Sequence, residues 1–397
     1  KEYADSLQIQ SRNKDIDARD YQIEAFAYCI RNRRQMLISP TASGKSFIIY
    51  TTMRWHLEQN RRCIIIVPTT SLVEQLYADF EDYSSANGWK TSYHCQKLYS
   101  GFSKDFSKDV LITTWQSVYL QPRSWFAQFN VIFGDEAHQF KAKSLTTILS
   151  GCINSDYRIG CTGTLDGTQT HRLVLEGLFG PVYKATTTKE LMDNDHLAKF
   201  KIKCLILKYS ESICKQSRDW SYNDEINYII LNKSRNEFIK NLTLSLEGNT
   251  LVLFQFVEKH GKDLYELILS SAKKRKVFFV FGGTDVEVRE SVRSITEKES
   301  DAIIVASYGT FSTGVNIRNL HNILFASPSK SRIRNLQSIG RGLRVGDNKT
   351  EATLFDISDD FRIGKFTNYT LKHFIERLKI YDEEKFVYKI YPIELKI

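Results

Sequence analysis

Short apolar runs alternate with helix-period segments over the first half of the chain. The runs are rich in Ile, Val, Leu and Phe, as buried parallel strands are. The predicted strands are Gln35–Ser39, Cys63–Val67, Val110–Thr113, Val131–Phe133 and Arg158–Cys161. Between them, Ser46–Leu57 and Ser71–Tyr83 carry apolar residues at helical spacing. This repeated strand–helix–strand order predicts an α/β fold, in which a parallel sheet has helices on both faces.

A second alternation of the same kind follows further along the chain. Its predicted strands are Thr250–Phe254, Val277–Val280, Ala302–Ala306, Asn322–Ala326 and Ala352–Phe355. Its predicted helices are Lys259–Ser270, Val286–Thr296 and Ser331–Ile339. The sequence therefore predicts two doubly wound parallel-sheet domains. In such sheets ligands bind in the loops at the carboxyl ends of the strands.

The domain boundaries follow from these two alternations. We expect domain 1 over residues 17–188 and domain 2 over residues 236–358, joined by a charge-rich linker or insertion over 189–235 that has a strand at Ile202–Tyr209. Because the chain opens with Lys1 and not Met, we expect a fragment or processed form in which a domain precedes the lead-in 1–16.

The tail is predicted to form a short C-terminal helical extension over residues 359–397. Its helix, near Tyr369–Tyr381, is aromatic and basic. Such a helix either contacts nucleic acid or packs against domain 2, and its apolar positions at helical spacing favour packing.

Composition narrows the class of protein. With 397 residues, 42% hydrophobic and 25% charged, the chain is a globular protein of two or three domains and not a disordered one. No apolar run has the length of a membrane span, so we expect no membrane partner. Seven scattered cysteines without a CxxC pair predict reduced thiols in a cytoplasmic protein and no structural zinc. A net charge of +9 favours a polyanionic partner, although weakly.

A phosphate-binding loop is predicted where Ser39–Ser46 follows a strand and opens a helix. The backbone of Thr41, Ala42, Ser43 and Gly44 would surround phosphate oxygens at the helix N-terminus. Lys45 would add a charge near the β and γ phosphates, and the Ser46 hydroxyl would ligate Mg²⁺. Ser39 stands where the pattern has Gly. The alternative is an ordinary helix start capped by Ser43.

An acidic pair follows the predicted strand Val131–Phe133. Asp135 would hold Mg²⁺, and Glu136 would act as general base on the attacking water. Alone, such a pair is usually a solvated turn, but the upstream phosphate loop favours a nucleotide site for ATP with Mg²⁺. His138 is either part of this site or an ordinary polar residue at a helix start.

Asp135–His138 reads DEAH, and with the phosphate loop it resembles superfamily two helicases of the DEAD/DEAH type. Further segments of domain 1 resemble motifs of that family in order. These are Arg19–Gln22, Val67–Leu72, Thr113–Ser117 and Thr162–Thr164. The resemblance implies that Gln22 reads adenine and that Thr69, Thr70, Thr114 and Gln116 contact the nucleic-acid backbone. It also implies that Thr162 and Thr164, with His138, couple hydrolysis to strand movement.

Domain 2 carries the remaining motifs of the family. Ser307–Asn316 resembles motif V, which implies strand contacts by Thr310 and Thr313 and a nucleotide contact by Gly314. Gln337–Arg344 resembles motif VI, so Gln337, Arg341 and Arg344 would face the nucleotide, with the arginines stabilising the transition state. Gly282, after the strand Val277–Val280, either contacts the backbone or makes a tight turn. The resemblance covers about 85% of the chain, roughly residues 17–356, and implies two tandem RecA-like domains.

Several phrases of the sequence resemble, more finely, a phage helicase of recombination and repair. They are SPTASGKS, VPTTSLVEQLYADF, VASYGTFSTGVNI and QSIGRGLR. This implies an ATP-dependent helicase that unwinds branched DNA, forks and RNA–DNA hybrids in the cytoplasm of an infected bacterium. We expect a monomer. The alternatives are a duplex translocase that separates no strands, and a non-catalytic nucleic-acid-binding module.

Overall fold

The computed structural model describes residues 1–395 apart from 12–13, 41, 100–104, 141, 164–168, 314–316, 318 and 329–350. The chain divides into two compact units, Lys1–Thr187 and Thr188–Ile397. Each unit is built around a sheet whose seven strands, within the described residues, are all parallel. The predicted fold class of two tandem doubly wound domains is confirmed.

The first unit has the strand order β5-β6-β4-β7-β8-β3-β9. These strands are β3 (Arg34–Ile38), β4 (Cys63–Val67), β5 (Cys95–Leu98), β6 (Val110–Thr114), β7 (Val131–Gly134), β8 (Tyr157–Thr162) and β9 (Val182–Lys184). A small antiparallel pair, β1 (Gln10–Ser11) and β2 (Lys14–Asp15), lies outside this sheet. The helices are α1 (Glu2–Ser6), α2 (Asp20–Arg31), α3 (Lys45–Glu58), α4 (Thr70–Tyr83), α5 (Thr91–His94), α6 (Trp115–Val118), α7 (Arg123–Phe126), η1 (Ala137–Gln139), α8 (Ala142–Gly151) and α9 (Gln169–Phe179).

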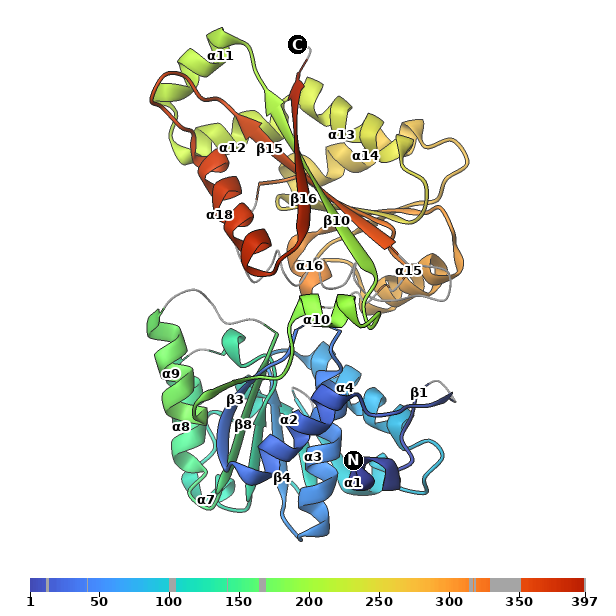
Figure 1. Ribbon diagram of the computed structural model, residues 1–397, viewed down its shortest axis with the longest axis vertical. Coiled ribbons are helices and arrows are strands. Elements are labelled where there is room, and N and C mark those ends of the chain that lie inside the picture. Colours follow the sequence, from blue (N-terminus) through green and yellow to red (C-terminus); the bar gives the residue numbers. More distant parts are fainter. Residues whose placement is uncertain are drawn as a thin grey trace. The chain divides into compact units, whose positions relative to one another are not determined.

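Alternate residues of the central strands face two different hydrophobic clusters. On β4, Ile65 packs with α2, α3 and α4, whereas Ile64 and Ile66 pack with α7, α8 and α9. Figure 1 shows these two helix groups on the two sides of the sheet. A strand buried on both faces must be apolar at every position, which is why β4 reads Cys-Ile-Ile-Ile-Val.

The second unit has the strand order β12-β13-β11-β14-β15-β10-β16. These strands are β10 (Lys199–Lys208), β11 (Thr250–Phe254), β12 (Val277–Val280), β13 (Ile303–Ser307), β14 (Asn322–Phe325), β15 (Glu351–Asp360) and β16 (Val387–Glu394). The helices are α10 (Thr188–Asp193), α11 (Glu211–Gln216), η2 (Ser217–Asp219), α12 (Tyr222–Leu231), α13 (Lys233–Ser245), η3 (Val257–Gly261), α14 (Lys262–Ser271), α15 (Val286–Lys298), α16 (Tyr308–Thr313) and α18 (Tyr369–Glu383).

The segments expected to flank domain 2 are part of the second unit. Residues 189–235, expected as a linker or insertion, contribute the inner strand β10 and helices α11 and α12. The tail adds a strand, β16, as well as the predicted helix α18. Phe374 and Tyr381 of α18 are buried, so this helix packs against the sheet, as its helical-period apolar residues indicate.

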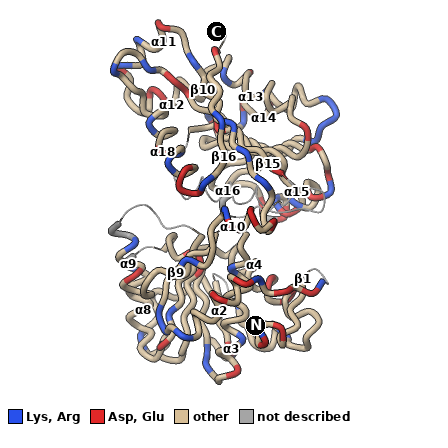
Figure 2. Tube along the Cα trace, viewed as in Figure 1, with Lys and Arg blue, Asp and Glu red and all other residues tan. Residues whose placement is uncertain are grey.

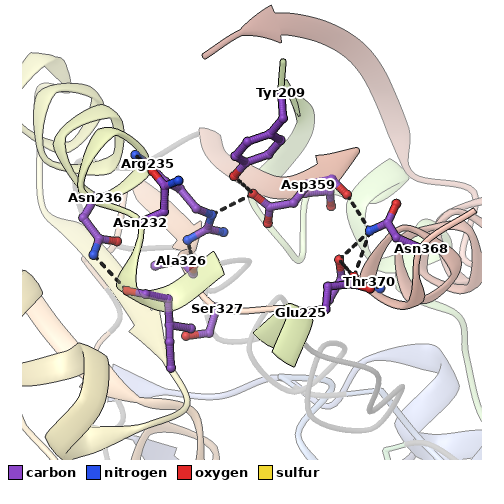
Figure 3. A network of polar contacts seen from close by, with 12 residues as sticks. Tyr209, Glu225, Asn232, Arg235, Asn236, Ala326, Ser327, Asp359, Asn368 and Thr370 are labelled. Atoms are coloured by element: carbon purple, nitrogen blue, oxygen red, sulfur yellow. Dashed lines mark hydrogen bonds and ion pairs between the residues drawn. The ribbon is translucent and has the colours of Figure 1, made fainter. Parts of the chain in front are cut away.

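Strand β15 is longer than its apolar run suggested. The expected strand ended at Phe355, but β15 continues to Asp360 because its aspartates have buried partners. Arg377 of α18 binds both carboxylate oxygens of Asp356, at 2.8 and 2.7 Å. Arg235 of α13 donates to Asp359 at 2.8 Å, and Figure 3 shows Asp359 within this network. A carboxylate paired with a guanidinium can occupy a core position that an unpaired one cannot.

Other features of the described residues agree with the composition. All seven cysteines are free and buried. None of the helices in the described ranges is long and apolar enough to cross a membrane.

The buried imidazole of His260 makes the stability of the chain depend on pH. Burial, together with the neighbouring charge of Arg235, lowers its pKa to about 3. The unfolded chain binds a proton below about pH 6.5, but the folded chain does not. Stability is therefore lost as pH falls below about 6.5, by about 1.4 kcal/mol per pH unit from this group.

We predict that His260→Gln flattens this dependence. Urea denaturation followed by circular dichroism at pH 7 and pH 5 measures the free energy lost on acidification. The variant should lose about 2 kcal/mol less than the wild type between these pH values. His94→Gln removes a more exposed imidazole and is the control. Equal losses in wild type and His260→Gln would contradict the prediction.

Candidate nucleotide site

The predicted phosphate loop lies between β3 and α3. Ala42 and Gly44 have left-handed backbone, with φ of 68° and 82°. Gly44 precedes the first helical residue, Lys45, so the loop meets a helix N-terminus. Thr41 lies outside the described residues. This strand–loop–helix geometry is the one in which backbone N–H groups bind phosphate.

The loop is held from within by serine hydroxyls. Ser43 Oγ donates to the carbonyl of Pro40 at 2.6 Å and lies 2.6 Å from Ser39 Oγ. Ser39, which stands where the motif has Gly, therefore supplies a contact that a glycine would not. Ser43 is inside the loop and does not cap α3 with its side chain, so the alternative of an ordinary serine cap is not what the structure shows.

Gln22 fixes the outer side of the loop. Its Nε2 donates to the carbonyl of Ser43 at 2.9 Å, and its Oε1 accepts the backbone N–H of Arg19 at 3.0 Å. Tyr21 donates to the same Ser43 carbonyl at 2.6 Å, a contact that sequence reasoning missed. Adenine recognition by Gln22 stays a prediction, whereas its support of the loop is a described contact.

The acidic pair lies beside the loop lysine. Lys45 Nζ is 3.5 Å from Glu136 Oε1 and donates to the carbonyl of Ser39 at 3.4 Å. The Lys45 and Glu136 side chains are only 12% and 18% exposed, so this pair is largely shielded from water. Glu136 itself has left-handed backbone with φ of 48°, a strained conformation of the kind found at functional sites. The acidic pair is thus not a solvated turn.

Burial and neighbouring charges shift the pKa values of the two carboxylates in opposite directions. Burial and the neighbouring Glu136 charge raise the pKa of Asp135 to about 7. For Glu136, burial opposes ionisation, but the charges of Lys45 and His138 hold its pKa below the usual range. Asp135 is therefore the carboxylate whose charge is poorly compensated by the protein, and Glu136 is the one that stays ionised.

The chemistry of these groups fits Mg²⁺. Asp135 and Ser46 offer hard oxygen atoms, and Mg²⁺ is usually held by one or two carboxylates together with phosphates and water. The described residues contain no group of three or more metal-binding side chains, so the protein alone does not form a closed metal cage there. The Ser46 hydroxyl lies 2.8 Å from the hydroxyl of Tyr83 on α4, a second contact that the sequence did not reveal.

Thr162 connects the two motifs. Strand β8 lies between β7 and β3, and its Thr162 carbonyl accepts the backbone N–H of Ser39 at 2.9 Å. The Thr162 hydroxyl lies 2.6 Å from His138 Nδ1. His138 is buried and lies in the short helix η1, and its membership of the site stays a prediction that this contact supports. Thr164 lies outside the described residues.

The predicted strand contacts of the first unit occupy neighbouring loops. Thr69 caps α4, and Thr70 is exposed at its first turn. Gln116 Nε2 donates to the carbonyl of Pro68 at 3.2 Å, which joins the loops after the paired strands β4 and β6. The Thr114 hydroxyl lies 2.8 Å from that of Ser117.

In the second unit, Gly282 and Thr310 lie close together. A Cβ built on Gly282 would be 4.0 Å from Thr310 Oγ1, and β12 pairs with β13. The Thr310 hydroxyl is buried and lies 2.8 Å from that of Ser307. Thr313 ends α16, but its side chain is not described. Gly314, Gln337, Arg341 and Arg344 lie outside the described residues, as does the predicted helix Ser331–Ile339.

Comparison with known proteins places the chain in a family. Residues 15–167 match the family "Type III restriction enzyme, res subunit", and residues 234–346 match "Helicase conserved C-terminal domain". The chain is 36% identical to the ATP-dependent DNA helicase UvsW of Enterobacteria phage T4, covering 99% of this chain and 81% of that protein. The chain belongs to the UvsW family of helicases. The resemblance read from the ordered motifs is confirmed.

Two more distant similarities also extend over most of this chain. The DNA 3'-5' translocase XPB2 of Sulfurisphaera tokodaii is 21% identical, covering 91% of this chain and 87% of that protein. The DNA-bound restriction-modification enzyme LlaBIII is 14% identical, with a TM-score of 0.69, over 96% of this chain and 32% of that chain. The LlaBIII likeness supports the tandem-domain fold alone.

We predict that Gly44→Ala disables the phosphate loop of this UvsW-family member. An added Cβ would lie 2.4 Å from Gln22 Nε2, which would displace the amide that holds the Ser43 carbonyl. The left-handed backbone adds a cost of about 1 to 2 kcal/mol. Binding of a fluorescent ATP analogue should weaken at least tenfold.

Gly88→Ala is the matched control for this prediction. Gly88 has φ of 75°, but a Cβ there would meet nothing within 4 Å. Both variants carry the backbone strain, and only Gly44→Ala has the collision with Gln22. If both variants bound the analogue equally well, the collision would not matter for nucleotide binding.

Proposed function

We propose that this chain is an ATP-dependent motor that hydrolyses ATP with Mg²⁺ and moves on nucleic acid. The observation that carries the proposal is the ion pair between Lys45 and Glu136, at 3.5 Å, at the carboxyl ends of β3 and β7. The phosphate loop and the general base are thereby already together. The UvsW relative, an ATP-dependent DNA helicase, supports the same conclusion.

In this proposal, Lys45 exchanges one partner for another. Phosphate oxygens of ATP would attract the ammonium group away from Glu136, and Asp135 and Ser46 would hold Mg²⁺, which would supply charge neutralisation for the phosphates. Losing the Lys45 charge raises the pKa of Glu136, because that charge helps to keep it low. Glu136 then becomes a stronger base for the attacking water when the substrate is in place.

The motif resemblance also assigns nucleotide contacts to residues of the second unit. Arg341 and Arg344 would stabilise the charge that develops on the γ-phosphate, with Gln337 and Gly314 beside the nucleotide. Their support is the motif resemblance and the helicase C-terminal family match, which spans residues 234–346.

The proposed nucleic-acid contacts use hydroxyls, amides and backbone groups that suit phosphates. They are Thr69, Thr70, Thr114, Gln116, Gly282, Thr310 and Thr313. Such contacts carry no sequence information, so binding is sequence-independent and salt-sensitive. Coupling of hydrolysis to movement is assigned to His138, Thr162 and Thr164.

The proposed substrates are branched DNA, forks and RNA–DNA hybrids, acted on by a monomer in the cytoplasm of an infected bacterium. The free state of the seven cysteines accords with a reducing compartment. The second candidate is a duplex translocase that separates no strands, which the similarity to an archaeal DNA translocase favours. A non-catalytic binding module is the third, and it is disfavoured by the intact Lys45–Glu136 pair.

We predict that Lys45→Ala abolishes nucleic-acid-stimulated ATP hydrolysis. Loss of one charge-stabilising group costs about 10²–10³ in turnover. Salt-sensitive DNA binding should remain, because Lys45 is largely buried beside Glu136. ATPase assays and oligonucleotide binding measure the two properties, with the exposed Lys143→Ala as control. Wild-type turnover in Lys45→Ala would refute the site.

We also predict ATP-dependent release of strands from forked DNA and from RNA–DNA hybrids. A gel assay on labelled forks, blunt duplexes and hybrids at fixed salt measures this release. ATP consumption with displacement of a bound protein but no release of strands from any substrate would favour the translocase. Absence of ATP hydrolysis on every substrate would favour the non-catalytic module.

A further inference from the structure

One face of β10 is lined by lysines. Along its first half, Phe200, Ile202 and Cys204 are buried, whereas Lys199, Lys201 and Lys203 are exposed. Successive side chains of a strand point to opposite faces, so the three lysines share one face, about 7 Å apart. An inner strand of a doubly wound sheet is usually covered on both faces, and this half of β10 is not.

The neighbouring edge strand extends this surface. In the register of β10 and β16, Lys203 lies beside Lys389 and Leu205 lies beside Tyr391. Lys389 is exposed, and Tyr391 is 39% exposed. We call this surface the lysine face and define it by Lys199, Lys201, Lys203, Lys389 and Tyr391. Figure 2 marks its lysines in blue along β10 and β16.

The positive charge of the lysine face is only partly neutralised. Lys201 forms an ion pair of 2.8 Å with Glu351 on β15. Lys203 Nζ lies 5.4 Å above the ring of Phe355. Within the described ranges, Lys199, Lys203 and Lys389 form no ion pair. Like charges on adjacent strands repel one another, so this arrangement costs stability unless an anion compensates it.

The apolar part of the lysine face indicates what kind of anion it fits. Tyr391 presents an aromatic ring beside Lys389, and Val387, next to Lys201 in the register, is 68% exposed. Exposed apolar residues on an edge strand promote aggregation unless they serve an interaction. A row of charges beside an aromatic ring matches a single nucleic-acid strand, whose phosphates bind lysines while a base stacks on the ring.

We propose that the lysine face binds single-stranded nucleic acid. Its lysines lie in the amino-terminal halves of β10 and β16 and Tyr391 lies near the middle of β16, whereas the motor's proposed contacts lie in loops at the carboxyl ends of strands. It is therefore a second binding surface, which holds a strand that the motor has separated or not yet engaged. The role of that strand rests on the proposed motor function, but the binding itself does not.

Charge reversal on the full-length chain tests this proposal. Lys203→Glu/Lys389→Glu should weaken binding of fluorescein-labelled oligo(dT) at least tenfold at 100 mM salt, about the effect of lost phosphate contacts. The slope of log affinity against log salt should fall by about 1.4, since each single-strand phosphate contact contributes about 0.7. ATP hydrolysis without nucleic acid should be unchanged.

Lys273→Glu/Lys274→Glu is the matched control. These lysines are exposed in the turn after α14 and give the same change in net charge on the same unit. Tyr391→Ala should weaken oligo(dT) binding without changing the salt slope, and Tyr391→Phe should retain binding. Circular dichroism melts of all variants verify that the chain remains folded.

The outcomes separate this proposal from the motor function. If the double variant binds oligo(dT) like its control, the lysine face is not a nucleic-acid surface, whatever the motor does. If polyglutamate binds as tightly as oligo(dT) and Tyr391→Ala has no effect, the face fits an acidic protein and the proposal is overturned. If the wild type shows no nucleic-acid-stimulated ATPase activity, the proposed motor function is wrong. The oligo(dT) affinities of the variants still test whether the lysine face binds nucleic acid.

Discussion

Three charged groups in a largely buried space impose the main constraint on the first unit. Lys45 stands 3.5 Å from Glu136, and the carboxylate of Asp135 is next to it. The charges of Lys45 and His138 compensate Glu136, whereas burial and the Glu136 charge make a charge on Asp135 costly, which is why the pKa of Asp135 rises to about 7. This distribution of charge supports the proposed places of a cation beside Asp135 and of phosphates beside Lys45.

The second unit uses buried charges in the opposite way. Asp356 and Asp359 of β15 are paired with Arg377 and Arg235, so the carboxylates are neutralised within the protein. Burial alone would lower the pKa of Arg377, but Asp356 raises it, so this guanidinium stays charged. These pairs attach α18 and α13 to the sheet, as Figure 3 shows for Arg235. The paired charges of the second unit stabilise its structure. The poorly compensated carboxyl group of Asp135 in the first unit instead suits a bound cation.

Sequence patterns predicted the strands that are apolar throughout and several amphipathic helices, and missed three edge strands. The bounds of β4, β11 and β12 follow directly from their apolar runs. Strands β5, β9 and β16 were missed because they are short, polar or exposed edges, and β15 was cut short at its first aspartate. Contacts such as Ser46 with Tyr83 join residues 37 positions apart, and no periodicity encodes them. The motifs identified the charged residues of the site, but not the hydrogen bonds that hold them.

Those supporting bonds explain how a change at the nucleotide can spread through the first unit. The loop is fixed on one side by Gln22, and Ser46 contacts Tyr83 on the other, so phosphates at the proposed site would act mainly on the Lys45–Glu136 pair. Glu136 is near His138, whose ring contacts the Thr162 hydroxyl, while the Thr162 carbonyl binds Ser39. One residue of β8 thus touches both motifs. A rearrangement of Glu136 would act on His138 and through it on Thr162, which supports the proposed role of Thr162 in coupling.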